Sequence, residues 1–291
     1  MESANYSRKD FLKLLGLGAA SLTFTGWNNV VKGKDGAPIA IQLYTVRREI
    51  EKDFKGTMHK IADMGFEGVE TYALPANITL AQAAKVFRDC GLKVISMHTE
   101  LPVGNQRDAI LKLADAYHCE YVTYHGWPQG DKFKNLEATK RTADTYNKTA
   151  YFLKTKGLHF GLHNHWWEFE KVDGVYPFYY LLEHLDKDIF FEIDTYWAKT
   201  GGMDPVKVVT DFGKRAPFLH IKDGPAIKGD KAYEQVPAGS GTMDFPSIVK
   251  AGGSNIKWMI VEFDEYAGNI FEGVQSSYTF MIKNGLAKGR V

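Results

Sequence analysis

The sequence predicts a single (β/α)8 barrel, and three observations carry that prediction. Short β-rich apolar runs alternate with helical patterns from residue 38 onward, eight such units fit the roughly 250 residues of such a barrel, and nearly every run ends in a polar or ionisable residue. The rival architecture is a doubly wound sheet. It is disfavoured because no predicted strand leads into a G-x-G-x-x-G phosphate turn.

The predicted strands are short apolar runs rich in β-branched and aromatic residues. Strands buried on both faces of a parallel sheet read as apolar runs, which favours parallel pairing. In chain order they are Ile39–Tyr44, a turn and strand over Gly65–Tyr72, Lys93–Met97, Tyr121–Tyr124, Leu158–Leu162, Ile189–Ile193, Pro217–Ile221 and Trp258–Val261. Together with the intervening helices they predict one domain over residues 37–291.

The predicted helices follow the strands in alternation. Gly91 and Gly157 end two of them as C-terminal glycines do, and Asp204-Pro205 caps and opens another. Residues 224–244 form a polar, Gly-rich connection that either covers the site or lies on the surface. The helices are Phe54–Met64, Leu80–Cys90, Gln106–Tyr117, Leu136–Lys156, Tyr176–Leu185, Asp204–Phe212, Phe245–Ala251 and Phe271–Asn284.

Residues 1–30 are predicted to be an export-signal segment. Ser7–Lys13 is cationic and precedes an apolar run, Leu14–Gly26, that is too short to span a bilayer comfortably. The segment resembles a twin-arginine signal in which Lys9 replaces the second arginine. Export predicts a periplasmic protein without stable membrane anchoring. The alternative is an amphipathic helix packed on the barrel of a cytoplasmic protein.

Composition excludes some partners. The net charge is +1 with no basic tract, so a nucleic-acid partner is not expected, and 44% hydrophobic with 24% charged residues is ordinary for a soluble domain. Cys90 and Cys119 form no CxxC pair or zinc-ribbon spacing and are predicted to be buried free thiols.

A candidate site arises where the strands end. Side chains alternate along a strand, so His163 and His165 point to one side and Asn164 to the other. The active site of a (β/α)8 barrel lies at the C-terminal ends of its strands, where these residues meet those of the other strands. Imidazoles mixed with carboxylates suit Mn²⁺, Co²⁺, Fe²⁺ or Zn²⁺ better than Ca²⁺. The residues at the strand ends are Tyr44, Glu70, His98, His125, His163 with His165, Glu192 with Asp194, His220 with Lys222, and Glu262 with Asp264.

Several segments carry a family resemblance through their order and spacing. They are Gln42–Arg47, Gly68–Glu70, His163–His165 with Glu168, Asp194–Trp197, Leu219–Asp223, Gly239–Phe245 and Val261–Glu262. From about Ile39 to the end, the chain resembles the xylose-isomerase-like barrel superfamily. This is the sugar phosphate isomerase/epimerase group, which also contains inosose dehydratases and endonuclease IV.

The resemblance implies one divalent metal held by Glu, Asp, His and Glu on strands five to eight. Asp194, His220 and Glu262 match the last three positions, and His163 stands where those relatives have glutamate. His165 or Glu168 is the alternative fourth ligand. The same departure resembles inosose dehydratases and related lyases that act on oxidised sugars.

The chemistry that the resemblance implies is proton abstraction from a carbon next to a carbonyl, through a metal-stabilised enediolate. His165 and Glu168 are the acid/base candidates, and Lys222 offers three donors to a sugar hydroxyl or the enediolate oxygen. Glu192 is predicted to orient a metal ligand from one layer deeper. Substrate-binding candidates are Tyr44, Glu70, His98, His125 and Trp197.

Three functions are compatible with these residues. The first is a sugar isomerase or epimerase, and the second is a lyase or dehydratase acting on keto-sugars, 3-keto-glycosides or keto-inositols. The third is a non-catalytic carbohydrate-binding barrel. All three predict a small-molecule carbohydrate as partner and leave a homo-oligomer open. A DNA-repair role is disfavoured because the chain lacks a basic stripe for the phosphate backbone.

Overall fold

The structure is a computed structural model that describes residues 36–290. Its strands are β1 (Ala37–Gln42), β2 (Gly68–Thr71), β3 (Lys93–Thr99), β4 (Tyr121–Tyr124), β5 (His159–His163), β6 (Phe190–Asp194), β7 (Phe218–Ile221), β8 (Trp258–Val261) and β9 (Ala287–Lys288). All pairings between them are parallel, and β1 pairs with both β2 and β8. The first eight strands therefore close into the predicted (β/α)8 barrel.

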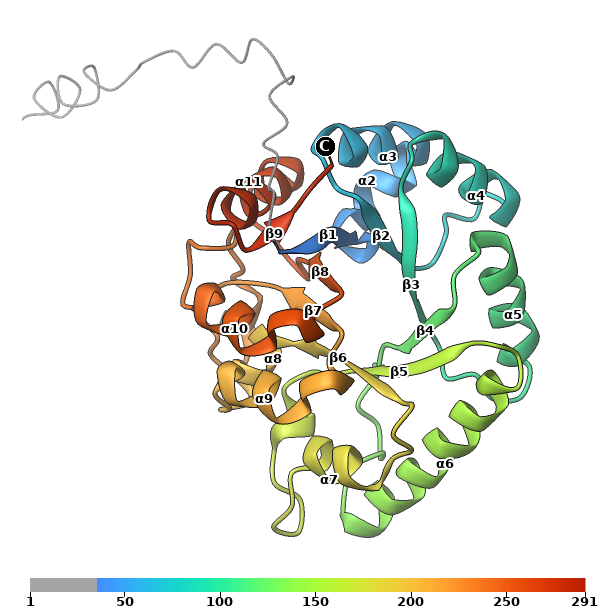
Figure 1. Ribbon diagram of the computed structural model, residues 1–291, viewed down its shortest axis with the longest axis vertical. Helices are drawn as coiled ribbons and strands as arrows, with labels where there is room; N and C mark the ends of the chain where they lie inside the picture. The colour runs from blue at the N-terminus through green and yellow to red at the C-terminus, as the bar shows by residue number, and fades with distance from the viewer. Residues whose placement is uncertain (1–35, 291) are drawn as a thin grey trace, which may run out of the picture.

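Helices surround the strands on the outside, as Figure 1 shows. The α-helices are α2 (Arg47–Lys52), α3 (Phe54–Asp63), α4 (Leu80–Asp89), α5 (Gln106–Tyr117), α6 (Leu136–Lys154), α7 (Pro177–His184), α8 (Thr195–Thr200), α9 (Pro205–Phe212), α10 (Phe245–Gly252) and α11 (Ile270–Lys283). Short 3-10 helices are η1 (Leu43–Val46), η2 (Trp167–Phe169), η3 (Gly213–Arg215), η4 (Asp230–Tyr233) and η5 (Gly253–Asn255). The eight predicted helices are confirmed to within about two residues at each end, which is the usual uncertainty of helix boundaries.

The interior of the barrel changes from apolar to polar along the strands. On β6, Phe190 belongs to an apolar interior cluster, while Glu192 and Asp194, two and four residues later, are buried acids on the same face. The interior is filled, because a Cβ on Gly161 would lie 2.2 Å from the Phe190 ring. The same progression on neighbouring strands places a polar layer above the apolar one, at the C-terminal ends of the strands.

Three differences from the predicted elements affect the site. β3 runs to Thr99, so His98 lies inside the strand and not beyond its end. Tyr44 lies in η1, because the Gln42 side chain accepts a hydrogen bond from the Tyr44 N–H and ends β1. Asp194 caps a short helix, α8, that the sequence pattern did not indicate.

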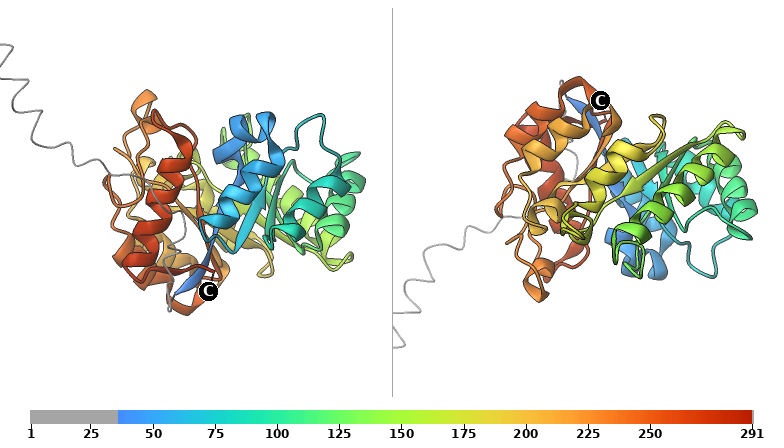
Figure 2. Two further views of the ribbon diagram at one scale, coloured as in Figure 1. Left: turned by 90° about the horizontal axis from the view of Figure 1, so that it is seen from above. Right: turned by 90° about the horizontal axis from the view of Figure 1, so that it is seen from below.

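The described ends of the chain meet at the start of β1. β9 pairs with β1 through Ala37 and Ala287, and Figure 2 shows the C-terminal end beside the first strand. The export segment predicted over residues 1–30 lies outside the described residues. Within residues 36–290, none of the helices combines the length and the apolar character needed to cross a bilayer.

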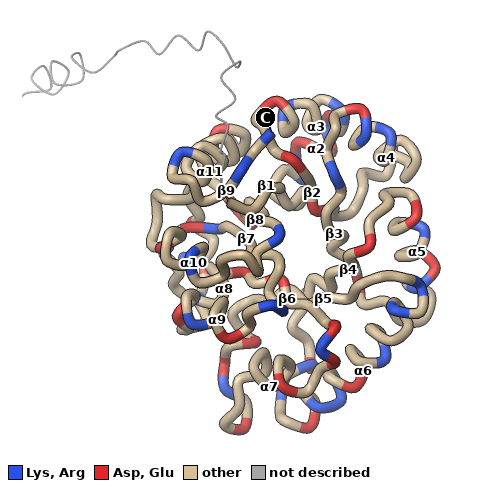
Figure 3. The backbone as a smooth tube through the Cα atoms, viewed as in Figure 1, with Lys and Arg blue, Asp and Glu red and all other residues tan. Residues whose placement is uncertain are grey.

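Charge is mixed over the surface. Figure 3 shows Lys and Arg interspersed with Asp and Glu along the outer helices. Cys90 and Cys119 are buried and free, as predicted.

The polar connection after β7 is organised around one carboxylate. Asp223 is 1% exposed, and its two oxygens accept four backbone N–H bonds, from Gly224, Gly239, Gly241 and Met243, at 2.8–3.1 Å. A Cβ on Gly241 would lie 2.3 Å from Asp223 Oδ1, so the close approach requires glycine. The connection is thus fixed from the strand end that also carries Lys222.

Replacing Asp223 by alanine is expected to lower the free energy of unfolding by about 3 kcal/mol or more, because four N–H groups lose a charged acceptor. Urea denaturation followed by circular dichroism measures this, and proteases should cut the variant within residues 224–244. Asp230→Ala, an exposed change in the same connection, should alter stability by less than about 0.5 kcal/mol. Equal stability of Asp223→Ala and the wild type would contradict this role.

Candidate active site

Four side chains from the ends of β5 to β8 converge inside the barrel. His163, Asp194, His220 and Glu262 each offer one ligand atom, and these atoms all lie within 4.8 Å of one another. All four residues are buried. We call this set the outer group. Two metal–ligand bonds of about 2.1 Å span a comparable distance, so the group has the dimensions of a coordination shell.

The position of Asp194 is fixed from two directions. Its Oδ1 accepts a hydrogen bond from the Trp197 N–H at 2.8 Å, which caps α8. The Asn164 side-chain amide binds the Asp194 backbone on both sides, donating to its oxygen at 3.1 Å and accepting from its N–H at 3.0 Å. Oδ2 is therefore left to face the other ligands. Burial alone would raise the pKa of Asp194, but Lys222 and His163 hold that pKa below its usual value.

His220 connects two layers of the barrel. Its Nε2 lies 2.9 Å from Glu70 Oε2 and 3.0 Å from Glu192 Oε1, and its Nδ1 lies 2.6 Å from Glu262 Oε2. Burial works against protonation, yet Glu192 and Glu262 raise the pKa of His220 well above its usual value. Because Nε2 faces the two deeper glutamates, Nδ1 is directed at the outer group, where a bound metal would replace its proton.

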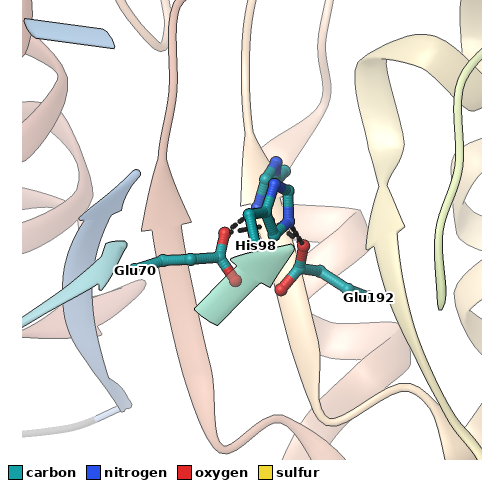
Figure 4. A group of neighbouring side chains, drawn as sticks. Glu70, His98 and Glu192 are labelled. Atoms are coloured by element: carbon teal, nitrogen blue, oxygen red, sulfur yellow. Dashed lines mark hydrogen bonds and ion pairs between the residues drawn. The ribbon is translucent and has the colours of Figure 1, made fainter. Parts of the chain in front are cut away.

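The deeper layer consists of Glu70, His98, Glu192 and His220, whose ligand atoms also lie within 4.8 Å of one another. We call it the inner group. Figure 4 shows the Glu70 and Glu192 carboxylates approaching His98 from either side, at 3.2 and 2.5 Å from Nε2. Gln42 donates to Glu70 Oε2 at 2.9 Å. Burial, followed by the charge of Glu192, raises the pKa of Glu70 to about 7.

Lys222 is buried against three carboxylates. Its Nζ lies 3.0 Å from Asp194 Oδ2, 2.9 Å from Glu262 Oε2 and 2.7 Å from Asp264 Oδ2. The ammonium also lies 5.3 Å from the centre of the Trp197 ring. Burial disfavours the charge, but the three acids raise the pKa of Lys222 well above its usual value. Its three donors face protein oxygens in this arrangement.

His165 and Glu168 lie beside the outer group. The His165 ring is centred 5.0 Å from the His163 ring and is stacked on Trp167 at 4.1 Å. Glu168 Oε2 accepts a hydrogen bond from the His165 N–H at 2.9 Å. Burial raises the pKa of Glu168 to about 8 despite this bond, and burial also lowers the pKa of His165 well below its usual value. The pair thus holds a neutral acid next to a neutral imidazole at neutral pH.

The residues predicted to contact substrate fall into two sets, one at the rim of the barrel and one in its interior. Tyr44 packs at 4.9 Å against Tyr72 and under Arg47, and His125 accepts a hydrogen bond from the Trp127 N–H on its Nδ1. Burial lowers the pKa of His125 to about 3. Glu70 and Trp197, by contrast, are 0% and 1% exposed.

Comparison with known proteins decides the family. A family model described as a xylose isomerase-like TIM barrel matches residues 58–275. The chain belongs to the xylose isomerase-like TIM barrel family. No curated protein matches the sequence.

Solved structures in this fold agree in shape. A sugar phosphate isomerase/epimerase from Parabacteroides distasonis ATCC 8503 has a TM-score of 0.73 and 25% identity, over 85% of this chain and 98% of that one. An L-ribulose 3-epimerase has a TM-score of 0.61 and 18% identity, over 86% and 94%. A probable 3-DHS dehydratase from Bacillus anthracis has a TM-score of 0.69 and 12% identity, over 84% and 98%. These relatives of the xylose isomerase-like barrel are isomerase, epimerase and dehydratase enzymes.

The donors of the outer group fit a divalent metal of the kind expected in a xylose isomerase-like barrel. Among residues 36–290, each member has a buried polar atom without a hydrogen bond of normal geometry: both ring nitrogens of His163, Asp194 Oδ2, His220 Nδ1 and Glu262 Oε2. The two carboxylate oxygens are contacted by Lys222 Nζ, and Glu262 Oε2 also by His220 Nδ1. The His163 nitrogens have no hydrogen-bond partner among these residues, and buried polar atoms rarely stay unpaired, so they indicate a missing one. Burial, partly offset by Asp194, lowers the pKa of His163 to about 4, which keeps the imidazole neutral as a metal ligand must be.

Of the three alternatives for the fourth ligand, His163 is the one that converges. The outer group found within the described residues contains neither His165 nor Glu168. His163 is therefore the alternative that lies with Asp194, His220 and Glu262.

Sequence reasoning missed the residues that hold the site in place. Asn164 was placed only on the side opposite to His163, and Gln42 only within a family-like segment. Neither was given a supporting role, because amides carry no signal of their own unless their partners are known. Asp264 was noted at a strand end but given no role, and its partner Gln235 lies 29 residues away in the chain. The spacing of residues along a strand gives no hint of these contacts, since each crosses between strands or connections.

Proposed function

We propose that this protein is a divalent-metal-dependent sugar isomerase or epimerase, with His163, Asp194, His220 and Glu262 as metal ligands. The observation that carries the proposal is the convergence of four buried ligand residues, among which His163 has no hydrogen-bond partner for either ring nitrogen in the described part of the chain. Mn²⁺, Co²⁺, Fe²⁺ or Zn²⁺ suits two imidazoles and two carboxylates. The substrate class is a small carbohydrate, in keeping with the names of the solved relatives.

A bound metal would polarise a substrate carbonyl and lower the cost of negative charge on the neighbouring oxygens. The chain's own contribution is to keep the ligands ready. Asp194 is held by Asn164 and by its cap on α8, and His220 is turned by Glu70 and Glu192 so that Nδ1 faces the outer group. Such supporting contacts orient ligands and tune their basicity.

His165 and Glu168 are proposed to move the proton. The Nδ1 atom of His165 is buried and has no hydrogen-bond partner in the described part of the chain, so a substrate atom can take that place. Its lowered pKa keeps the ring unprotonated at neutral pH, which is the form that a base needs before proton transfer. A positioned base or acid of this kind contributes about 10²–10⁴ in rate.

Substrate contact is proposed for the rim residues Tyr44 and His125, and support for the buried ones. Glu70 and Trp197 are enclosed by protein, and the His98 side chain is only 7% exposed. This favours a role in positioning His220 and Lys222 over direct contact with sugar. Trp127, by contrast, is 52% exposed and its ring lies 5.8 Å from that of His165. It offers a flat apolar face next to the proposed base.

A lyase is the second candidate, and the pKa of Glu168 favours it. With that pKa at about 8, the carboxyl group is protonated at neutral pH and could donate its proton to a departing hydroxyl or alkoxyl group. The dehydratase among the solved relatives is compatible with this chemistry on the same fold.

The proposal is tested by metal analysis and by hydrogen exchange in D₂O. The protein loaded with Mn²⁺ or Zn²⁺ and incubated with a panel of keto-sugars should place deuterium on the carbon next to the carbonyl, as read by NMR, and chelation should stop the exchange. Exchange without loss of water or aglycone identifies the isomerase or epimerase. Exchange coupled to elimination identifies the lyase. Bound sugar without any exchange would overturn both in favour of a non-catalytic barrel.

A further inference from the structure

We propose that Lys222 is a built-in counter-cation that shares Asp194 and Glu262 with the metal and weakens metal binding. The inference rests on the proposed function, because it concerns how the outer group treats a cation. Its basis is the position of the ammonium, which is within 3.0 Å of one oxygen on each of two proposed ligands.

The shared oxygens are the ones that carry the metal proposal. Asp194 Oδ2 and Glu262 Oε2 lack a hydrogen bond of normal geometry, and they are also the atoms that face Lys222 Nζ. The two cations would therefore compete for the same electron pairs. Lys222 is 2% exposed, so water cannot replace it as the partner of these acids.

A third acid keeps Lys222 in place. Asp264 Oδ2 lies 2.7 Å from Nζ and also accepts a hydrogen bond from Gln235 Nε2 at 2.8 Å. Gln235 Oε1 in turn accepts from the Asp264 N–H at 2.7 Å. The ammonium is thus linked through Asp264 to Gln235 in the connection after β7. Asp264 is not a member of the outer group, so a bound metal would leave this contact intact. Lys222 would therefore stay near the metal even when Asp194 and Glu262 bind that metal.

The consequence is a site that is charged and ordered before metal arrives. Two buried carboxylates without a cation would repel each other, whereas the Lys222 ammonium lies within 3.0 Å of both and holds them together. The cost is repulsion between the ammonium and a divalent ion a few ångströms away, which is substantial at the effective dielectric of a protein interior. Lys222 therefore orders the two carboxylates before metal binds and lowers the affinity of the site for the metal. A weakly held metal of this kind can exchange with solution.

The test is a Mn²⁺ titration of the purified full-length protein, with affinity read by competition against a fluorescent chelator. Lys222→Gln should bind Mn²⁺ about tenfold or more tightly than the wild type, because the site gains one net negative charge. The variant free of metal should also melt at a lower temperature and gain more from added Mn²⁺ than the wild type does. Lys228→Gln is the matched control, since Lys228 pairs with Glu170 outside the outer group.

A second variant tests the same role in case Lys222→Gln does not fold. Asp264→Asn removes one negative charge beside the site and leaves Lys222 with only the two proposed ligands as acidic partners. It should therefore weaken Mn²⁺ binding by about tenfold, without altering a proposed ligand. A lysine with a merely structural role predicts weaker binding in both variants. The opposed signs therefore identify the counter-cation.

Three outcomes would overturn the role of Lys222, and only the last of them would also overturn the proposed metal-dependent function. Unchanged or weaker binding by a folded Lys222→Gln removes the counter-cation role and leaves the proposed function intact. If Lys222→Gln does not fold, unchanged or tighter Mn²⁺ binding by Asp264→Asn likewise removes the counter-cation role and leaves the proposed function intact. Absence of Mn²⁺ binding by the wild type and every variant removes the proposed metal together with this inference.

Discussion

Replacing Glu262 by glutamine is expected to remove stoichiometric metal and to lower kcat by about 100-fold or more. Glutamine keeps the size of the side chain but takes one of the two negative charges from the outer group. It also leaves Lys222 and His220 without an acid that each now contacts within 3.0 Å. Metal content after dialysis, together with the exchange of substrate hydrogen for deuterium, measures both effects.

A folding control separates lost chemistry from lost structure. Breaking a buried ion pair costs about 3–5 kcal/mol, so thermal melting of Glu262→Gln must be recorded beside activity. Glu183→Gln on the exposed face of α7 should retain metal, activity and melting temperature. A folded Glu262→Gln that keeps wild-type metal content would refute the ligand assignment.

The pH dependence of kcat/KM should bend near pH 8 in the metal-loaded protein, and the direction of the bend reports the role of Glu168. Burial raises the pKa of this carboxyl group to about 8. If the ionised form acts as base, the rate rises as pH increases through about 8 and then levels. If the protonated form acts as acid, the rate is constant below about pH 8 and falls above it.

Glu168→Gln should abolish this bend and lower kcat by about 10²–10⁴, with metal content unchanged. The control is Glu170→Gln, two residues further on, whose side chain is 44% exposed and pairs with Lys228. A Glu168→Gln protein with the wild-type rate and the same bend would exclude Glu168 from proton transfer.

The barrel and the outer group were within reach of sequence reasoning for one physical reason. Parallel strands place their C-terminal ends at one face, so residues that follow separate apolar runs, such as Asp194 and Glu262, are brought together by the fold itself. Alternation along a strand also predicted that Glu192 lies one layer below Asp194, and the structure places it there, against His220.

The sequence did not reveal how deep inside the barrel individual side chains lie. A register shift between β2 and β3 at Val69/Glu70 and the extension of β3 to Thr99 turn His98 into the interior, where it meets Glu70 and Glu192. Such shifts leave no mark on an apolar pattern, because runs buried on both faces look alike in either register. The burial of Lys222 could not be foreseen either, since its three acids come from β6 and from beyond β8.

The pairing of β9 with β1 sets where a fused partner would stand. β9 joins β1 at Ala37 and Pro38, the N-terminal end of that strand, whereas the outer group occupies the opposite mouth of the barrel. A domain or affinity handle joined to the chain beyond β9 would therefore start on the side of the barrel away from the outer group. Immobilising the protein by that end leaves the mouth open to soluble carbohydrate.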